Sequence, residues 1–174
     1  MPSLTLQTLV NDPRLRETLA NLSAPNRRGE SAEEFLSCFP VVDQLGIAIA
    51  QKLGSQAGIA NVTRASYTIP LPVTPACLSI CAALFGRGIA ITEIFEGEDR
   101  PNYIVFGTVP SSSLHWEGTF EADISQEHDG AETSLNVTYP GQLIAWGAGP
   151  RLLKHVKTDS LAVAVRIARA LKAG

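Results

Sequence analysis

The sequence has little charge, few aromatic side chains and no dense run of basic residues. Asp, Glu, Lys and Arg make up 18% of the 174 residues, below the ~25% usual for globular proteins, and the net charge is −3. No basic run stands out apart from Arg27-Arg28. Because a phosphate-binding face needs clustered Lys and Arg, we expect no nucleic-acid partner. The length predicts one ordinary domain, and the composition leaves the oligomeric state open.

Cysteine is also scarce. The three cysteines, Cys38, Cys77 and Cys81, are too few and odd in number for a disulfide framework, which favours a reduced compartment. The N-terminal residues "MPSLTLQTLVNDPRLRE" lack the basic start and the apolar core of a secretory signal, so we predict a cytoplasmic protein. Four-ligand metal sites need more Cys or His than this chain offers, and we expect no metal. We interpret Cys77 and Cys81 as buried thiols that pack as small apolar groups.

The sequence has no apolar run suited to a membrane span. The charge-free stretch "ASYTIPLPVTPACLSICAALFG" (65–86) contains three prolines, whereas a span needs about 20 predominantly apolar residues. We therefore expect no integral membrane segment. The chain also lacks a P-loop, a dinucleotide-binding glycine fingerprint and a G-x-S-x-G elbow, so we expect no cofactor.

Helical signals lie at the two ends of the chain. Asp12 and Pro13 predict a helix that begins there and ends near residue 22. Ser31 and Glu34 form an S-x-x-E capping box for a second helix, which Pro40 kinks or splits. A long amphipathic helix is predicted to begin at Pro150. Its apolar stripe consists of Leu152, Val156, Val163, Ile167 and Leu171.

The middle of the chain changes from helical to alternating periodicity. Residues 64–72, 88–97, 103–109, 115–124 and 133–139 predict strands separated by polar turns, one of which contains Asp129-Gly130. The stretch "ACLSICAALF" (76–85) suits either a helix or a buried strand. Separate groups of helices and strands predict an α+β fold, in which a curved antiparallel sheet wraps on the long C-terminal helix and extra helices precede it. Such an arrangement often leaves a ligand cavity between sheet and helix.

Several segments, in order, resemble a known family. "RRGESAEEFLSC", "PACLSICAALFGRGIAITEIFEGEDRPNYIVFGTVP", "WEGTF" and "YPGQLIAWGAGPRLLKHV" are similar to segments of the DUF1990 (UPF0548) family, which is placed with the START and Bet v 1-like (SRPBCC) helix-grip proteins. Ser112 stands where that family has a histidine, and Gly118 replaces the second of its paired glutamates. The resemblance implies one START/Bet v 1-like domain over residues 27–174. Residues 1–26 have no counterpart in the family, and we expect them to form an N-terminal helical extension. The resemblance also implies that residues 76–85 form a strand.

Four residues are candidates for acid–base chemistry. His115 and Glu117 lie two apart on a predicted strand and would point the same way, although a solvated pair is the alternative if Trp116 faces the core. Glu93 interrupts an Ile-rich strand. His155 lies near the start of the last helix, where a surface position is the alternative.

Aromatic residues with a polar tip are the better candidates for lining a cavity. An interior Tyr or Trp needs a hydrogen-bond partner, which a ligand could supply. The candidates for ligand binding are Tyr67, Tyr103, Trp116, Tyr139 and Trp146, although packing in the core is the alternative for most of them.

Three hypotheses about function follow. The first, which the resemblance implies, is the binding of a small hydrophobic molecule of the lipid, polyketide or terpenoid class in an internal cavity. The second is a cyclase, isomerase or dehydratase that acts on such a molecule in the same cavity. The third is a protein-interaction module that uses the N-terminal segment.

Overall fold

The computed structural model describes residues 5–16, 60–97, 101–112, 117–140 and 147–172. Its helices and strands are α1 (Leu6–Val10), β1 (Ala60–Ile69), α5 (Val73–Gly86), β2 (Ala90–Glu96), β3 (Asn102–Val109), β4 (Gly118–Glu127), β5 (Gly130–Pro140) and α6 (Ala148–Lys172). Residues 13–16 form a further helical turn. Asp12 caps this turn, because its Oδ1 accepts a hydrogen bond from the backbone N–H of Arg14 at 2.9 Å. The helix predicted from residue 31 and the third cysteine, Cys38, lie outside the described residues.

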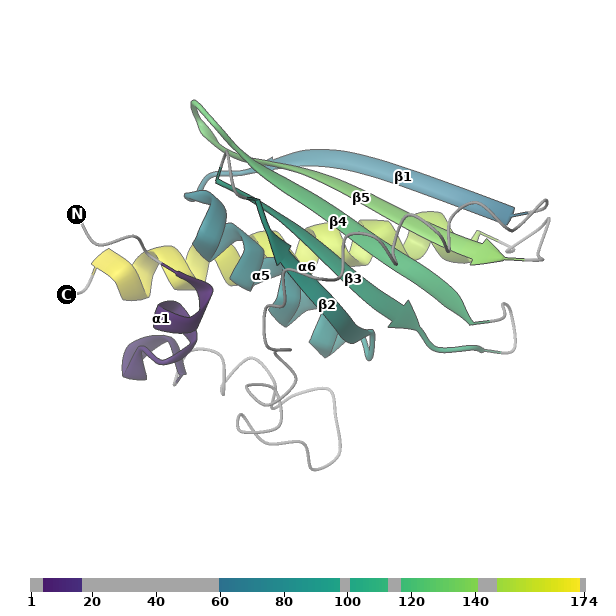
Figure 1. Ribbon diagram of the computed structural model, residues 1–174, viewed down its shortest axis with the longest axis horizontal. Coiled ribbons are helices and arrows are strands. Elements are labelled where there is room, and N and C mark those ends of the chain that lie inside the picture. The colour runs from purple at the N-terminus through teal and green to yellow at the C-terminus, as the bar shows by residue number, and fades with distance from the viewer. Residues whose placement is uncertain (1–4, 17–59, 98–100, 113–116, 141–146, 173–174) are drawn as a thin grey trace.

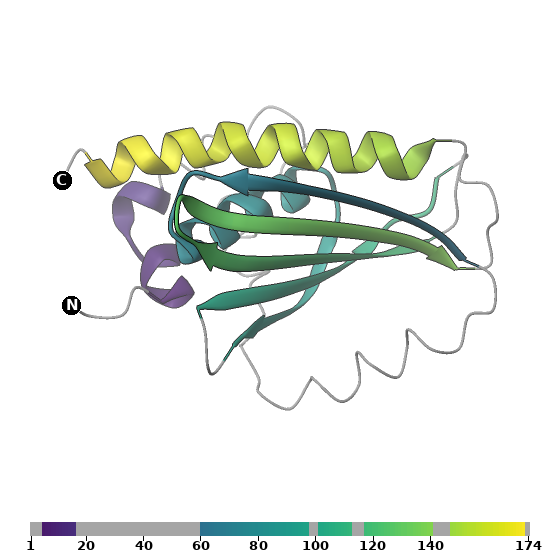
Figure 2. The same ribbon diagram turned by 90° about the horizontal axis from the view of Figure 1, so that it is seen from above.

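The strands form one antiparallel sheet in the order β1-β5-β4-β3-β2. β2 to β5 follow one another as hairpins, and β1 closes the sheet by pairing with β5. The sheet curves along the long helix α6, and α5 lies beside α6 on the same side (Figures 1 and 2). The α+β helix-grip architecture predicted from the sequence is therefore confirmed, including helices before the sheet.

The last helix follows its predicted stripe for most of its length. Val156, Val163 and Ile167 are buried, and Leu153 and Ser160 are buried beside them. Leu171 was predicted to be part of the stripe, but its side chain is 37% exposed, because the last turn of α6 extends past the core. The stripe thus holds α6 on the sheet from its first turns to Ile167.

Residues 76–85 are helical, so the strand implied by the family resemblance is wrong. The stretch belongs to α5, in which twelve residues from Val73 to Phe85 are buried. A helix that is apolar all round fits a site enclosed on all sides, and here the sheet, α6 and α1 all contact α5. Pro75 is compatible with this helix because a proline in the first turn removes no intrahelical hydrogen bond. Cys77 and Cys81 are free, buried thiols, as predicted.

Alternate residues of each strand face the helices or turn away from them. We call the side that carries α5 and α6 the inner face and the opposite side the outer face. In β4 the inner residues Phe120, Ala122 and Ile124 are buried, whereas the outer residues Thr119 and Asp123 are exposed. This matches the alternation predicted from the sequence.

The turn between β4 and β5 is tied to α5. Gly130 follows the predicted turn with φ +146°, and a Cβ at this position would press on the carbonyl oxygen of Ile69, so only glycine fits there. The Gln126 side chain donates to the carbonyl oxygen of Gly130 at 2.9 Å and accepts from the N–H of Val73 at 2.8 Å. Gln126 therefore satisfies a backbone donor in the first turn of α5, a role that a capping side chain usually has.

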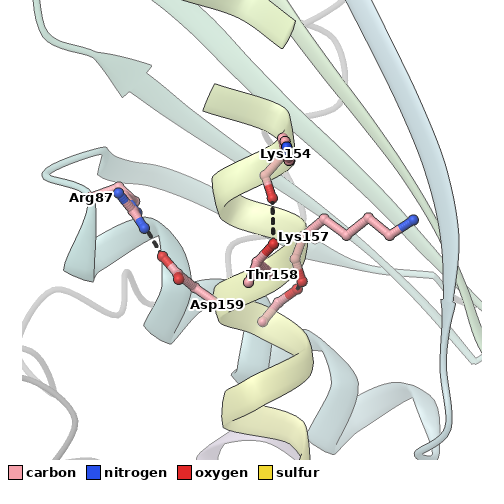
Figure 3. A network of polar contacts seen from close by, with 6 residues as sticks. Arg87, Lys154, Lys157, Thr158 and Asp159 are labelled. Atoms are coloured by element: carbon pink, nitrogen blue, oxygen red, sulfur yellow. Dashed lines mark hydrogen bonds and ion pairs between the residues drawn. The ribbon is translucent and has the colours of Figure 1, made fainter. Parts of the chain in front are cut away.

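An ion pair joins α5 to α6 at the opposite end of α5. The Nε atom of Arg87 lies 2.6 Å from Oδ2 of Asp159, and both side chains are about one-third exposed (Figure 3). In the same stretch of α6, the Thr158 hydroxyl donates to the carbonyl oxygen of Lys154 at 2.9 Å. Among the described residues, no helix is both long enough and apolar enough to cross a membrane.

Candidate functional site

One row of residues crosses all five strands and carries four polar side chains on the inner face. The register pairs Glu96 with Tyr103, Tyr103 with Ile124, Ile124 with Thr133, and Thr133 with Tyr67. Directly opposite residues in an antiparallel sheet share a face, so these five side chains form one line across the sheet. We call this line the hydroxyl row, because Tyr103, Thr133 and Tyr67 contribute hydroxyl groups to it.

The hydroxyl row ends at β1 with Tyr67, which reaches α6. Its hydroxyl lies 2.7 Å from the Oγ atom of Ser160. Ser160 donates its own proton to the carbonyl oxygen of Lys157 at 3.0 Å, so Tyr67 is the donor in the Tyr67–Ser160 bond. Burial raises the pKa of Tyr67 to about 12. The Lys157 ammonium lies 5.4 Å from the centroid of the Tyr67 ring, within cation–π range.

Towards the β2 edge, the hydroxyl row contains Tyr103. Its hydroxyl donates to Oε1 of Glu96 at 3.1 Å and lies 3.4 Å from the Oγ1 atom of Thr74 in the first turn of α5. Since the tyrosine proton is used on the carboxylate, Thr74 is the donor in the second contact. Burial raises the pKa of Tyr103 to about 12, and the nearby Glu96 carboxylate acts in the same direction.

Near the middle of the hydroxyl row, Thr133 has a buried hydroxyl without a partner. Its side chain is 0% exposed, and among the described residues no hydrogen-bond partner lies within reach of Oγ1. A buried polar group left unpaired costs about 1–3 kcal/mol. Such groups are rare in native proteins and need a physical reason.

The surroundings of the hydroxyl row are apolar. The neighbouring inner-face residues Ala122, Ala131 and Leu135 are fully buried. Among the described strand residues, Glu96 at the sheet edge is the one charged side chain on this face, and α5 carries no charge at all. The row is therefore a narrow polar line within an apolar interior.

The Cys77 thiol, which lies near the row, is not activated as a nucleophile. Burial raises the pKa of Cys77 well above its usual value, and the neighbouring Cys81 acts in the same direction. A thiol is reactive as its thiolate, so this environment keeps Cys77 inert. In the part of the chain that the structure describes, no group of three or more His, Cys, Asp or Glu residues could hold a metal ion.

All three tyrosines predicted to bind a ligand lie on the inner face and are buried: Tyr67, Tyr103 and Tyr139. The Tyr139 ring lies over Gly118, where a Cβ would come within 2.7 Å of Cδ1. Burial also raises the pKa of Tyr139. The two tryptophans, Trp116 and Trp146, lie outside the described residues.

The residues predicted to be catalytic are not brought together. Glu93 is paired with Phe106 on the outer face, away from α5 and α6. Glu117 precedes β4 and is exposed, and His155 is exposed on α6. His115 lies outside the described residues. The described part of the chain therefore shows no acid–base pair on the inner face that includes any of these side chains.

Sequence reasoning overlooked Thr133, Ser160, Thr74 and Glu96. A signal existed for the first two. Thr133 is in phase with the inward residues Leu135 and Val137 of the same strand, and Ser160 lies four residues after Val156 in the apolar stripe of α6. Polar residues at core-facing positions are therefore the signal that identifies this row.

Comparison with known proteins finds similar solved structures but no family. No family model matches the chain, and no curated protein matches it. Sixteen chains among the solved structures are similar to it. One of these is described as the crystal structure of Ara h 8.0201, with 14% sequence identity, a TM-score of 0.34, and coverage of 65% of this chain and 99% of that chain.

Proposed function

We propose that the protein binds a small hydrophobic molecule between the inner face of the sheet and the helices α5 and α6. The observation that carries this proposal is the fully buried, unpartnered hydroxyl of Thr133, which lies in an apolar interior at the level of two buried tyrosines. A bound molecule that supplied a partner would remove the cost of the lone hydroxyl. Small-molecule sites commonly combine an apolar lining with a few placed polar groups.

The classes of ligand that we propose are those named from the sequence: lipids, polyketides or terpenoids. An interior of this kind would gain about 25 cal/mol for each Å² of apolar ligand surface removed from water. Membership of the DUF1990 family stays a prediction, since no family model matches the chain.

The described residues give less support to an enzyme. A cyclase, isomerase or dehydratase needs a titratable group placed at the reacting atoms. On the described inner face the titratable groups are Glu96 at the sheet edge and the tyrosines Tyr67, Tyr103 and Tyr139. Burial raises the pKa of all three tyrosines, which suits hydrogen bonding better than proton transfer near neutral pH. The interaction-module hypothesis for residues 1–26 also stays a prediction.

Native mass spectrometry tests the proposal. Gently purified protein is measured before and after extraction with an organic solvent. We expect a reproducible added mass that extraction removes, and its fragmentation would identify the chemical class. If only the mass of the bare chain is found, and the extracted protein also fails to take up the neutral dye Nile red, the proposal is wrong.

Two variants at adjacent positions of β4 serve as matched controls. Ala122→Leu adds a side chain on the inner face, where Ala122 is 0% exposed, and Asp123→Leu adds the same side chain on the outer face. We expect uptake of Nile red to fall in the inner variant and to persist in the outer one. Circular dichroism shows whether each variant has kept its fold. Equal loss of uptake in two folded variants would contradict binding at the inner face.

A further inference from the structure

The hydrogen bonds within the hydroxyl row determine which kind of ligand atom the row can recognise. The proton of Tyr67 is used on Ser160, and the proton of Tyr103 is used on Glu96. Thr133 alone in the row has a hydroxyl proton that is not committed to another group. An unused donor is satisfied by an acceptor, so the ligand atom that completes the row is an oxygen that accepts a hydrogen bond.

The charges around the row determine the charge of that oxygen. The described strand residues of the inner face contribute no cation, and their one charged group, Glu96, is an anion in the same row. Lys157 lies beside the Tyr67 ring but is exposed, so its ammonium is hydrated. A ligand carboxylate beside Thr133 would lose its hydrating water without gaining a buried cation, so its binding there is unfavourable.

From these two observations we infer that the ligand is a neutral molecule with an apolar body and a carbonyl or hydroxyl oxygen, and that this oxygen accepts a hydrogen bond from Thr133. This inference deepens the proposed function and rests on it. It separates neutral oxygenated molecules, such as ketones and alcohols, from free fatty acids, although both have apolar chains.

The inference also predicts an opposition between binding and stability at Thr133. Without ligand the unpaired hydroxyl is unfavourable, so Thr133→Val, which keeps the shape and removes the hydroxyl, raises the melting temperature of the extracted protein. The same change weakens binding of an oxygenated ligand. A purely structural threonine would not give both effects, because its loss would not depend on the oxygen of the ligand.

Competition against Nile red with four ten-carbon probes tests the inference. The probes are 2-decanone, 1-decanol, decanoate at a pH where it is ionised, and decane. The proteins are wild type, Thr133→Val and Thr133→Ser, which restores a hydroxyl. Comparing one probe between two proteins cancels the partitioning of that probe from water, so only the contribution of the hydroxyl remains.

We expect Thr133→Val to weaken competition by 2-decanone and 1-decanol about five- to tenfold, the effect of one neutral hydrogen bond. Competition by decane should not change, and Thr133→Ser should recover most of the loss. Decanoate should compete more weakly than 2-decanone in the wild type.

Each contrary outcome has a definite meaning. If wild type takes up Nile red but Thr133→Val binds the ketone as well as wild type does, the inference is overturned and the proposed function stands. If decanoate competes as well as 2-decanone, the neutrality of the ligand is wrong and Lys157 becomes the candidate partner. If wild type takes up neither Nile red nor any probe, the proposed function fails together with the inference.

Discussion

The inner and outer faces of the sheet are built from alternate residues of the same five strands, but they differ in the polar groups they present. The inner face is largely apolar, and the hydroxyls of Tyr103, Thr133 and Tyr67 lie in one line across it. The outer face carries charged side chains at half-buried or exposed positions. These are Arg64, Glu93, Glu121, Asp123, Glu127 and Glu132.

From this difference we expect a neutral apolar molecule at the inner face and water at the outer face. Charged groups remain on the side where they can stay hydrated, while neutral hydroxyls enter the interior, where each needs a partner. Two of the three hydroxyls in the row have partners within the protein and one does not. Substitutions on the inner face should therefore change the free energy of unfolding and ligand uptake more than substitutions on the outer face.

The largest difference in stability is expected between variants of two adjacent β4 residues that lie on opposite faces. Ile124 is 0% exposed, so Ile124→Ala should lower the free energy of unfolding by about 2–5 kcal/mol. Asp123→Ala, on the outer face, should change it by less than about 0.5 kcal/mol. Urea denaturation of both variants measures the difference, and similar values for the two would contradict the assignment of faces.

Alkaline pH should lower the stability of the fold through the buried tyrosines of the inner face. The ordinary pKa of tyrosine is 10.0 and that of Tyr67 in the folded chain is about 12, so folding favours the neutral phenol. The stability that this provides is present below pH 10 and is lost as the pH rises from 10 towards 12. Tyr67 alone should account for roughly 2–3 kcal/mol of that loss.

An ultraviolet titration of phenolate absorbance checks this directly. The chain has three tyrosines, and the pKa of each is raised in the fold. The folded protein should show little phenolate at pH 10, whereas protein in denaturant should be about half ionised there. A tyrosine that titrates near pH 10 in the folded protein would show that its hydroxyl is hydrated.

A smaller effect is expected at the hydrogen bond between the sheet and α6. Tyr67→Phe removes a donor but leaves the Ser160 proton on the carbonyl oxygen of Lys157, so the cost should be about 1 kcal/mol. Ser160→Ala leaves the Tyr67 hydroxyl buried without its partner and should cost more, within about 1–3 kcal/mol. Thermal unfolding of both single variants and of the double variant measures the coupling. The reverse order of the two costs would be evidence against the donor assignment.

The smallest effect is expected on the outer face at Glu93. Because this side chain lies opposite Phe106 and away from the helices, Glu93→Gln should change the free energy of unfolding by less than about 0.5 kcal/mol. Uptake of Nile red should equal that of the wild type. A variant that keeps its fold but loses uptake would place Glu93 at the ligand.

Glu93 also shows a limit of reading faces from sequence. Ile91 pairs with Gly107 and lies on the inner face. Glu93 is two residues further along, so regular alternation would place it on the inner face as well. An irregularity between them shifts the register, and Glu93 pairs with Phe106 on the other face. A bulge of this kind depends on the partner strand, so periodicity within one strand does not reveal it.

The sequence predicted the strands more reliably than it predicted the helix between them. The alternation of apolar and polar residues correctly predicted strands at β4 and β5, because one face of each strand is apolar and the other is polar. α5 is buried on nearly all sides, so neither a helical nor a strand period stands out in its sequence. The hydroxyl row could be recognised only in the structure, since it depends on the register of four strand pairs.

Methyl-resolved NMR of the extracted protein, titrated with 2-decanone, tests the central claim most directly. The reporters are Ile124 and Leu135 beside Thr133 on the inner face, and Val62 and Ile104 on the outer face. The account predicts saturable shifts of the Ile124 and Leu135 methyl signals, with little change at Val62 and Ile104. Shifts that are confined to the outer-face methyls, or an absence of shifts at Ile124 and Leu135 while the ketone is bound, would contradict it.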